Sequence, residues 1–295
     1  MKFLFDLLSR SPFWAIRSEA VPAALTALSR GPRPTASEMI WEAAKPSILG
    51  KTGGKIQVIP VEGVLTKDGP AWYGSSYDSI GKAVETAAAD PEVKHIVLAV
   101  DSPGGEVTGL PEAAASIAAA AKVKPVTAMV TGMAASAAYF MASQARDVVL
   151  TPSGEVGSVG VRMMHVYYSK MLEQDGIKVT ELSSGKYKTE WSPYKPLSEE
   201  AIESEMPRLA SIHQDFISAV NAGRGERLGQ QMREQRIGEG RMFSGNDALG
   251  HGLVDRLQSS RDFYKTIVSE SAQTDAVVPT LPRAKTTHAH RLRKG

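Results

Sequence analysis

The chain has 295 residues, of which 42% are hydrophobic and 22% charged, a composition typical of an ordinary globular protein. Its net charge of +2 is too small to indicate a nucleic-acid partner. Because the sequence contains no cysteine, thiol catalysis, disulfides and cysteine-ligated metal sites are excluded. No segment reaches the roughly 18 uncharged apolar residues of a membrane span, so no membrane anchor is expected.

The N-terminal region differs in pattern from the rest of the chain. Residues 1–50 are predicted to form a helical extension, and no motif in them carries chemistry. Charged residues interrupt the apolar start, which favours an amphipathic helix docked on this chain or on a partner over a secretory signal. Residues 51–260 are predicted to form the main domain, and residues 261–295 a flexible basic tail.

Predicted strands and helices alternate along the main domain. The segment 56–61 has the alternation of a strand, and its Pro60 favours an edge position. A helix at 79–89, a buried strand at 95–100, an Ala-rich helix at 107–121 and a strand at 126–130 follow. This order predicts an α/β fold with a mainly parallel sheet and flanking helices, in which sites lie at the carboxyl ends of strands.

The second half of the domain continues the alternation less regularly. A short strand is predicted at 147–150, a Gly-rich connection at 154–160 and a strand–helix–strand unit at 163–182. Ser198, with acidic residues behind it, is a suitable N-cap for an amphipathic helix that runs to about Val220. One short helix and a final strand are expected within 243–255, and the core should end near Tyr264.

A serine among small residues is the first candidate for chemistry. Ser136 follows an apolar strand and a Gly-led turn and precedes an Ala-rich helix, so its hydroxyl should lie at a helix N-terminus. On its own, such a serine is more often a cap or a packing residue. The Ser-Pro-Gly-Gly turn predicted at 102–105 could offer backbone N–H groups as an oxyanion hole, or could need glycine for its geometry alone.

A nucleophilic serine needs a base. The histidines support this role poorly, because His95 begins a strand at the opposite end and His165 is better explained as a core residue within a strand. Lys186 and Lys188 follow a predicted strand end, and a lysine could act as base if burial lowered its pKa toward neutrality. A solvated surface charge is the plain alternative for either lysine.

Five motifs, in order, resemble the signal peptide peptidase A (protease IV) family of Ser/Lys peptidases. They are Ser-Pro-Gly-Gly at 102–105, Gly-Met-Ala-Ala-Ser-Ala-Ala-Tyr at 132–139, Gly-Ser-Val-Gly-Val at 157–161, Ser-Gly-Lys-Tyr-Lys at 184–188 and Gly-Arg-Met-Phe-Ser-Gly at 240–245. The resemblance covers about Ile56 to Leu257 and is closest to the short, unanchored branch that includes bacteriophage head proteases. It implies a ClpP/crotonase-like fold and assembly into a homo-oligomeric ring.

The resemblance also implies roles for individual residues. The nucleophile, the general base and a serine that orients the base amine match Ser136, Lys188 and Ser158. The oxyanion hole matches the N–H groups of Gly105 and Ala137. If the register of the lysine motif is displaced, Lys186 takes the place of Lys188. Many members have Ser-Gly-Gly where this chain has Ser-Ala-Ala, which predicts a tighter pocket near the nucleophile.

The implied reaction is hydrolysis of a peptide bond through a Ser/Lys dyad and an acyl-enzyme, with no cofactor and no metal. The expected setting is the host cytoplasm or the prohead, with capsid scaffold or portal proteins as candidate substrates during head maturation. The alternatives are a bacterial peptidase that degrades signal peptides, a non-catalytic capsid scaffold component, and a crotonase-like acyl-CoA enzyme. The last of these would use Glu106 or Glu112 as its acid.

Overall fold

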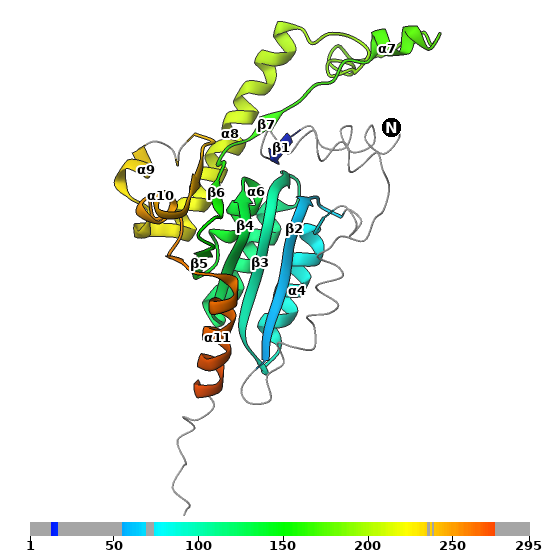
Figure 1. Cartoon of the computed structure of the whole chain (residues 1–295). Helices are drawn as coiled ribbons and strands as arrows, with labels where there is room; N and C mark the ends of the chain where they lie inside the picture. The colour runs from blue at the N-terminus through cyan, green and yellow to red at the C-terminus, as the bar shows by residue number, and fades with distance from the viewer. Residues whose placement is uncertain (1–12, 17–54, 69–73, 235–236, 238, 275–295) are drawn as a thin grey trace, which may run out of the picture.

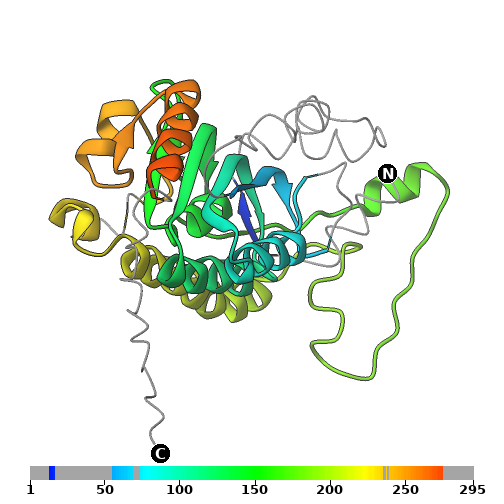
Figure 2. The ribbon, with the colours of Figure 1, turned by 90° about the horizontal axis from the view of Figure 1, so that it is seen from below.

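The computed structural model describes residues 13–16, 55–68, 74–234, 237 and 239–274. These residues form a nine-stranded sheet with helices on both faces (Figures 1 and 2). The central strands, which are parallel to one another, are β2 (Lys55–Leu65), β3 (Val93–Glu106), β4 (Val126–Ala135) and β5 (Asp147–Leu150). The expected α/β class with a mainly parallel sheet is confirmed.

Five short strands extend the sheet at its margins. They are β1 (Phe13–Ile16), β6 (Glu155–Gly157), β7 (Arg162–Met163), β8 (Met242–Ser244) and β9 (Arg256–Leu257). β1 pairs antiparallel with both β3 and β7, and β6 joins β4 in parallel and β8 in antiparallel orientation. The strand at Phe13–Ile16 replaces the predicted helical extension at these residues, while the rest of residues 1–50 lies outside the described residues.

The helices cover the two faces of the sheet. They are α4 (Tyr77–Ala89), α5 (Leu110–Val123), α6 (Ala137–Ala142), α7 (Ser169–Gln174), α8 (Glu199–Arg224), α9 (Gln230–Glu234), α10 (Gly245–Gly250) and α11 (Ser260–Thr274), with a 3-10 turn at Gly225–Arg227. Helices α4 and α5 and the C-terminal half of α8 line one face, and α11 lies on the other (Figure 2). Among the described residues, no helix combines the length and the apolar character needed to cross a membrane.

Both faces of the central strands are buried, which explains their continuous apolar runs. Ile96 and Leu98 of β3 belong to the large core under α4, α5 and α6, and Val97 points into the smaller core on the other face. That smaller core includes Phe263 and Ile267 of α11, so the core extends past its expected end near Tyr264. The helix α11 also replaces the first part of the predicted flexible tail.

Strands β3 and β4 both run past their predicted ends. β3 continues through the Ser-Pro-Gly-Gly motif because its last residues pair with β2 on one edge and with β1 on the other. β4 continues through Gly132, where a turn was expected. The Asp101 carboxylate accepts a hydrogen bond from the Met133 N–H (3.1 Å), and a Cβ at position 132 would lie 2.4 Å from that carboxylate. Gly132 therefore makes room for Asp101 inside a strand.

The predicted strand at 177–182 is absent. This segment has no regular structure, and Leu182 is 93% exposed, because no strand of the described chain lies beside it to supply backbone hydrogen bonds. The N-cap of α8 is confirmed, since the Ser198 side chain accepts a hydrogen bond from the Ala201 N–H (3.1 Å).

A buried ion pair fastens the C-terminal end of α8 to the sheet. The Arg224 guanidinium, with no exposed side-chain surface, donates to both carboxylate oxygens of Asp255 (2.8 and 3.0 Å) and to the Gly252 carbonyl. Asp255 also accepts the Val148 N–H of β5 (2.7 Å). Burial alone would raise the pKa of Asp255, but these hydrogen bonds and the guanidinium charges of Arg224 and Arg227 hold that pKa below its ordinary value.

Replacing this carboxylate should destabilise the protein strongly. Asp255→Asn leaves the Arg224 charge buried without its counter-ion, which we expect to lower the free energy of unfolding by about 3–5 kcal/mol at pH 7 in urea titrations. The double variant Arg224→Met/Asp255→Asn removes both charges and should lose less stability.

The same ion pair makes stability depend on pH. Because folding lowers the pKa of Asp255, the stabilisation from this carboxylate is present above the pKa of the unfolded chain and is lost as the pH falls through the folded-state pKa. A single variant as stable as the wild type would contradict this role.

Candidate active site

The strand β4 changes its neighbour along its length. Its first half pairs with β5, and its end pairs with β6, where Ala135 lies opposite Gly157. The next N–H in the chain, that of Ser136, donates to the Gly157 carbonyl (2.8 Å). This pairing brings the two serines that sequence analysis singled out, Ser136 and Ser158, to adjacent strand ends.

Ser136 has a strained backbone at the start of α6. Its φ of 53° and ψ of −120° lie outside the regions that a non-glycine residue favours, and it serves as the N-cap of the helix. The side chain is nearly inaccessible in the single chain, since the residue is 1% exposed. Its Oγ lies 3.4 Å from the Gly160 carbonyl, to which it donates a long hydrogen bond. Such strain, of order 1–3 kcal/mol, clusters at functional sites.

Ser158 has the same unusual φ of 53° and follows Gly157, whose φ is 129°. Its N–H donates to the Arg241 carbonyl (2.7 Å), just before β8. A Cβ on Gly157 would lie only 2.5 Å from that carbonyl oxygen, so position 157 requires glycine. The backbone at Arg241 therefore clamps the second serine, a role that sequence analysis missed although the Gly-Arg-Met-Phe-Ser-Gly motif contains this residue.

The two predicted oxyanion residues lie at the same edge of the sheet as Ser136. Ala137 is fully buried as the first residue of α6, where helix N–H groups have no partner within the helix. Gly105 lies near the end of β3, three residues beyond Ser102, which pairs with Ala134 of β4. A Cβ on Gly105 would lie 1.8 Å from the Leu65 carbonyl oxygen, so this glycine is also needed for the close approach of β2.

Lys188 lies apart from these residues. It belongs to the segment 164–198 between β7 and α8, which we call the arm and which projects away from the sheet (Figures 1 and 2). Lys188 is exposed, and its N–H donates to the Gly185 carbonyl (3.1 Å). Lys186 pairs with Glu200 (2.8 Å), and hydrogen bonds with Glu200 and Tyr187 raise its pKa. The single chain thus brings together the two serines and the predicted oxyanion residues but not the lysine.

The histidines have structural partners. His165 lies outside any strand, contrary to expectation, and its Nε2 is 2.9 Å from the Ser192 carbonyl, with its ring edge against Trp191. His95 contacts Thr127 (2.9 Å) at the beginning of the strands, where burial lowers its pKa. Among the residues that the structure describes, no three histidine, aspartate or glutamate side chains gather as metal ligands would.

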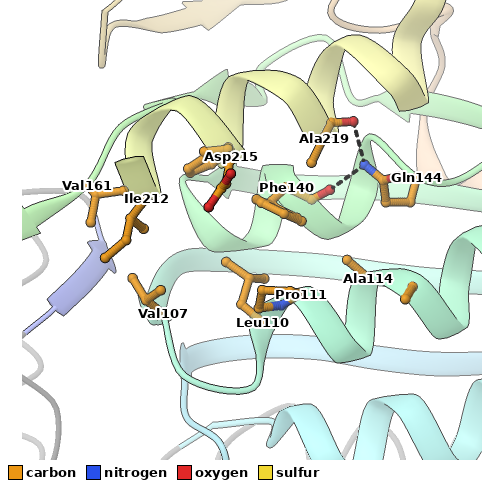
Figure 3. Close-up of a pocket in the computed structure, with 12 residues that line it drawn as sticks. Val107, Leu110, Pro111, Ala114, Phe140, Gln144, Val161, Ile212, Asp215 and Ala219 are labelled. Atoms are coloured by element: carbon orange, nitrogen blue, oxygen red, sulfur yellow. Dashed lines mark hydrogen bonds between the residues drawn. The ribbon is translucent and has the colours of Figure 1, made fainter. Parts of the chain in front are cut away.

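A pocket of about 560 Å³ adjoins this site (Figure 3). Its lining comes from Val107 after β3, the start of α5, Phe140 of α6, Val161 before β7 and the middle of α8. Phe140 is one helical turn from Ser136, and Val161 follows Gly160 in the chain. The lining is mainly apolar, and Asp215 supplies a carboxylate at its α8 wall.

The backbone strain at Ser136 has a measurable consequence. Ser136→Gly should raise the free energy of unfolding by about 1 kcal/mol relative to Ser136→Ala, because only glycine relieves the positive φ and part of that gain offsets its greater unfolded-state entropy. Both variants lack the hydroxyl, so they form a matched pair in a denaturant titration. Equal stability of the two would show that the positive φ costs nothing.

Comparison with known proteins gives the class of this chain. It belongs to peptidase family S49, whose family model matches residues 118–274. It is similar to capsid assembly protease C of Escherichia phage lambda, with 35% identity over 70% of this chain and 47% of that protein. It is also similar to protease 4 of Salmonella typhi, with 34% identity over 70% of this chain and 33% of that protein. The chain thus spans about half the length, or less, of these two relatives.

A solved structure is similar over a comparable share of the chain. It is the 1510-N membrane protease of Pyrococcus horikoshii, specific for a stomatin homologue, with a TM-score of 0.44 and 15% identity. The match covers 72% of this chain and 78% of that one.

Proposed function

We propose that this chain is a serine endopeptidase with Ser136 as its nucleophile and Lys188 as its general base. The observation that supports this most strongly is the strained backbone of Ser136, fixed beside Ser158 at the carboxyl ends of the strands. The positive φ of this serine costs free energy, and strain of this kind clusters at sites where the strained residue has a function. Family membership supplies the reaction class, which is peptide-bond hydrolysis.

The reaction would proceed by acyl transfer. The neutral Lys188 amine accepts the Oγ proton of Ser136 as the oxygen attacks the substrate carbonyl, and the N–H groups of Gly105 and Ala137 donate to the resulting oxyanion. The lysine ammonium then gives its proton to the leaving amine, and water hydrolyses the ester. Ser158 would accept a hydrogen bond from the lysine and orient its amine.

The lysine would reach the serine from another copy of the chain. The arm leads away from the body that holds Ser136, and several of its apolar side chains are exposed. They include Ile177 (51%), Leu182 (93%) and Tyr187 (59%). An apolar surface of this kind is typical of a contact site. We therefore propose a homo-oligomer, with ring symmetry as its closed form, in which one copy's arm completes the next copy's site.

The setting we favour is maturation of a phage capsid in the prohead or the host cytoplasm, with scaffold or portal proteins as substrates. The similarity to a capsid assembly protease supports this choice, and the similarity to protease 4 supports a bacterial signal-peptide-degrading peptidase as the alternative. A crotonase-like acyl-CoA enzyme is less suitable. Glu106 is buried and its carboxylate accepts the Lys67 N–H (3.1 Å), which gives it a structural role.

Three variants test the dyad. Ser136→Ala and Lys188→Ala should each lower kcat for an unfolded protein substrate by at least on the order of 10³-fold, because each removes a group that acts only as part of a pair. Lys186→Ala is the matched control, since Lys186 pairs with Glu200 and should leave kcat unchanged. Labelling of Ser136 by a fluorophosphonate probe gives a second readout. A labelled but fully active Lys188→Ala variant would refute the lysine base, and an unlabelled wild type would favour a non-catalytic scaffold component.

Mixing two inactive variants tests the source of the lysine. In a co-expressed mixture of Ser136→Ala and Lys188→Ala chains, some sites combine an intact serine with a neighbour's intact lysine. Random assembly through a head-to-tail interface should then restore about a quarter of the wild-type activity. No recovery in mixed oligomers that assemble normally would show that each chain supplies both groups itself.

A further inference from the structure

The position of β1 follows from the two edges of β3. At Gly104 and Gly105, one edge pairs with Val64 and Leu65 of β2. The opposite edge belongs to β4 as far as Ser102 and then, at residues 104–106, to β1. Because β2 already occupies its own side, β1 must lie on the β4 side of β3. It therefore continues the sheet directly beyond the point where β4 ends and Ser136 begins.

The direction of β1 leads toward the nucleophile. Trp14 pairs with Glu106, Ala15 with Gly105 and Ile16 with Gly104, so β1 runs antiparallel to β3 and toward Ser102. Ile16 is thus displaced by about two residues, or roughly 7 Å, from the position where β4 still pairs with β3.

The other edge of β1 meets a second part of the site. Phe13 pairs with Met163 and Trp14 with Arg162 of β7. β7 begins two residues after Gly160, whose carbonyl accepts the Ser136 hydroxyl. β1 therefore fills a slot between β3, which carries Gly105, and β7, which follows Ser158 in the chain. The backbone of β1 pairs with both strands.

We propose that residues 13–16 of the chain occupy the strand position of a substrate peptide and compete with it for the active site. The inference rests on the proposed peptidase function. An extended peptide added between two strands binds through its backbone, so one slot accepts different sequences. Gly105 would face two demands, because this residue is assigned to the oxyanion hole and is also paired with Ala15 of β1. A segment tethered to its own slot is also present at an effective concentration on the order of millimolar. Substrate then enters only when β1 leaves.

Proline substitutions in the full-length chain test this occupancy. Ala15→Pro and Trp14→Pro each remove a backbone donor within β1. Because β1 pairs on both edges and the N–H groups of adjacent strand residues point to opposite edges, the two variants weaken different edges. Ser9→Pro, upstream of β1 in the sequence, is the matched control. The readouts are amide hydrogen exchange at residues 104–106 and 162–163, fluorophosphonate labelling of Ser136 and cleavage of an unfolded protein.

We expect faster exchange at the partner strand in each β1 variant. Labelling and cleavage should become about fivefold faster, because loss of one backbone hydrogen bond raises the population of the open slot by about that factor. A synthetic peptide of residues 10–19 should restore both exchange protection and the slower rate. Unchanged exchange in both variants, or faster exchange without faster labelling or cleavage, would overturn the proposal, as would the same acceleration in Ser9→Pro. If neither the wild type nor any variant is labelled or cleaves, the proposed peptidase function fails. Exchange protection that is lost in the β1 variants and restored by the peptide would then show that residues 13–16 occupy the slot without competing with a substrate.

Discussion

One backbone hydrogen bond, from the Ser136 N–H to the Gly157 carbonyl, joins the two strand ends that carry the site. It lies where β4 ends and α6 begins, and it holds Gly157, which precedes Ser158, against Ser136. Both serines then have a positive φ, a conformation that persists only where the surroundings determine it fully. The surroundings here are the pairing of β4 with β6, the close approach of the Arg241 carbonyl, and the buried helix α6 that begins after Ser136.

Local pattern was sufficient to predict the order of the elements from β2 to β5 and the placement of Ser136 between β4 and α6. The buried strand β3 has a continuous apolar run, and Ser198 carries the cap signal of α8, so both were identified without tertiary information. The ends of β3 and β4 were not, because partner strands decide them. Gly132 resembles a turn glycine in sequence, yet its cause is Asp101 on the neighbouring strand. The strand at Phe13–Ile16 likewise depends on edges formed by residues far along the chain.

The candidate site also has a part that the sequence predicts well and a part that it does not. The motifs around Ser136 and Ser158 lie on strands that pair, so sequence order and the rules of parallel sheets bring them together. The lysine motif lies in a segment without a strand, where spacing along the chain carries no information about distance. Under the proposed assembly, Lys188 would meet Ser136 across a contact between copies, and such a contact leaves no periodic pattern in a sequence.

The helix α8 connects these two parts of the molecule. Its buried residues Phe216, Ile217 and Val220 pack against the body, and Arg224 holds its end to Asp255, while most of its first half is exposed. A helix of 26 residues is about 39 Å long and does not stretch. The length of α8 therefore sets the distance between the body and the arm. In an assembly of copies, adding or removing one helical turn would change the reach of the arm by about 5 Å and rotate its base, and thereby the spacing at which subunits fit together.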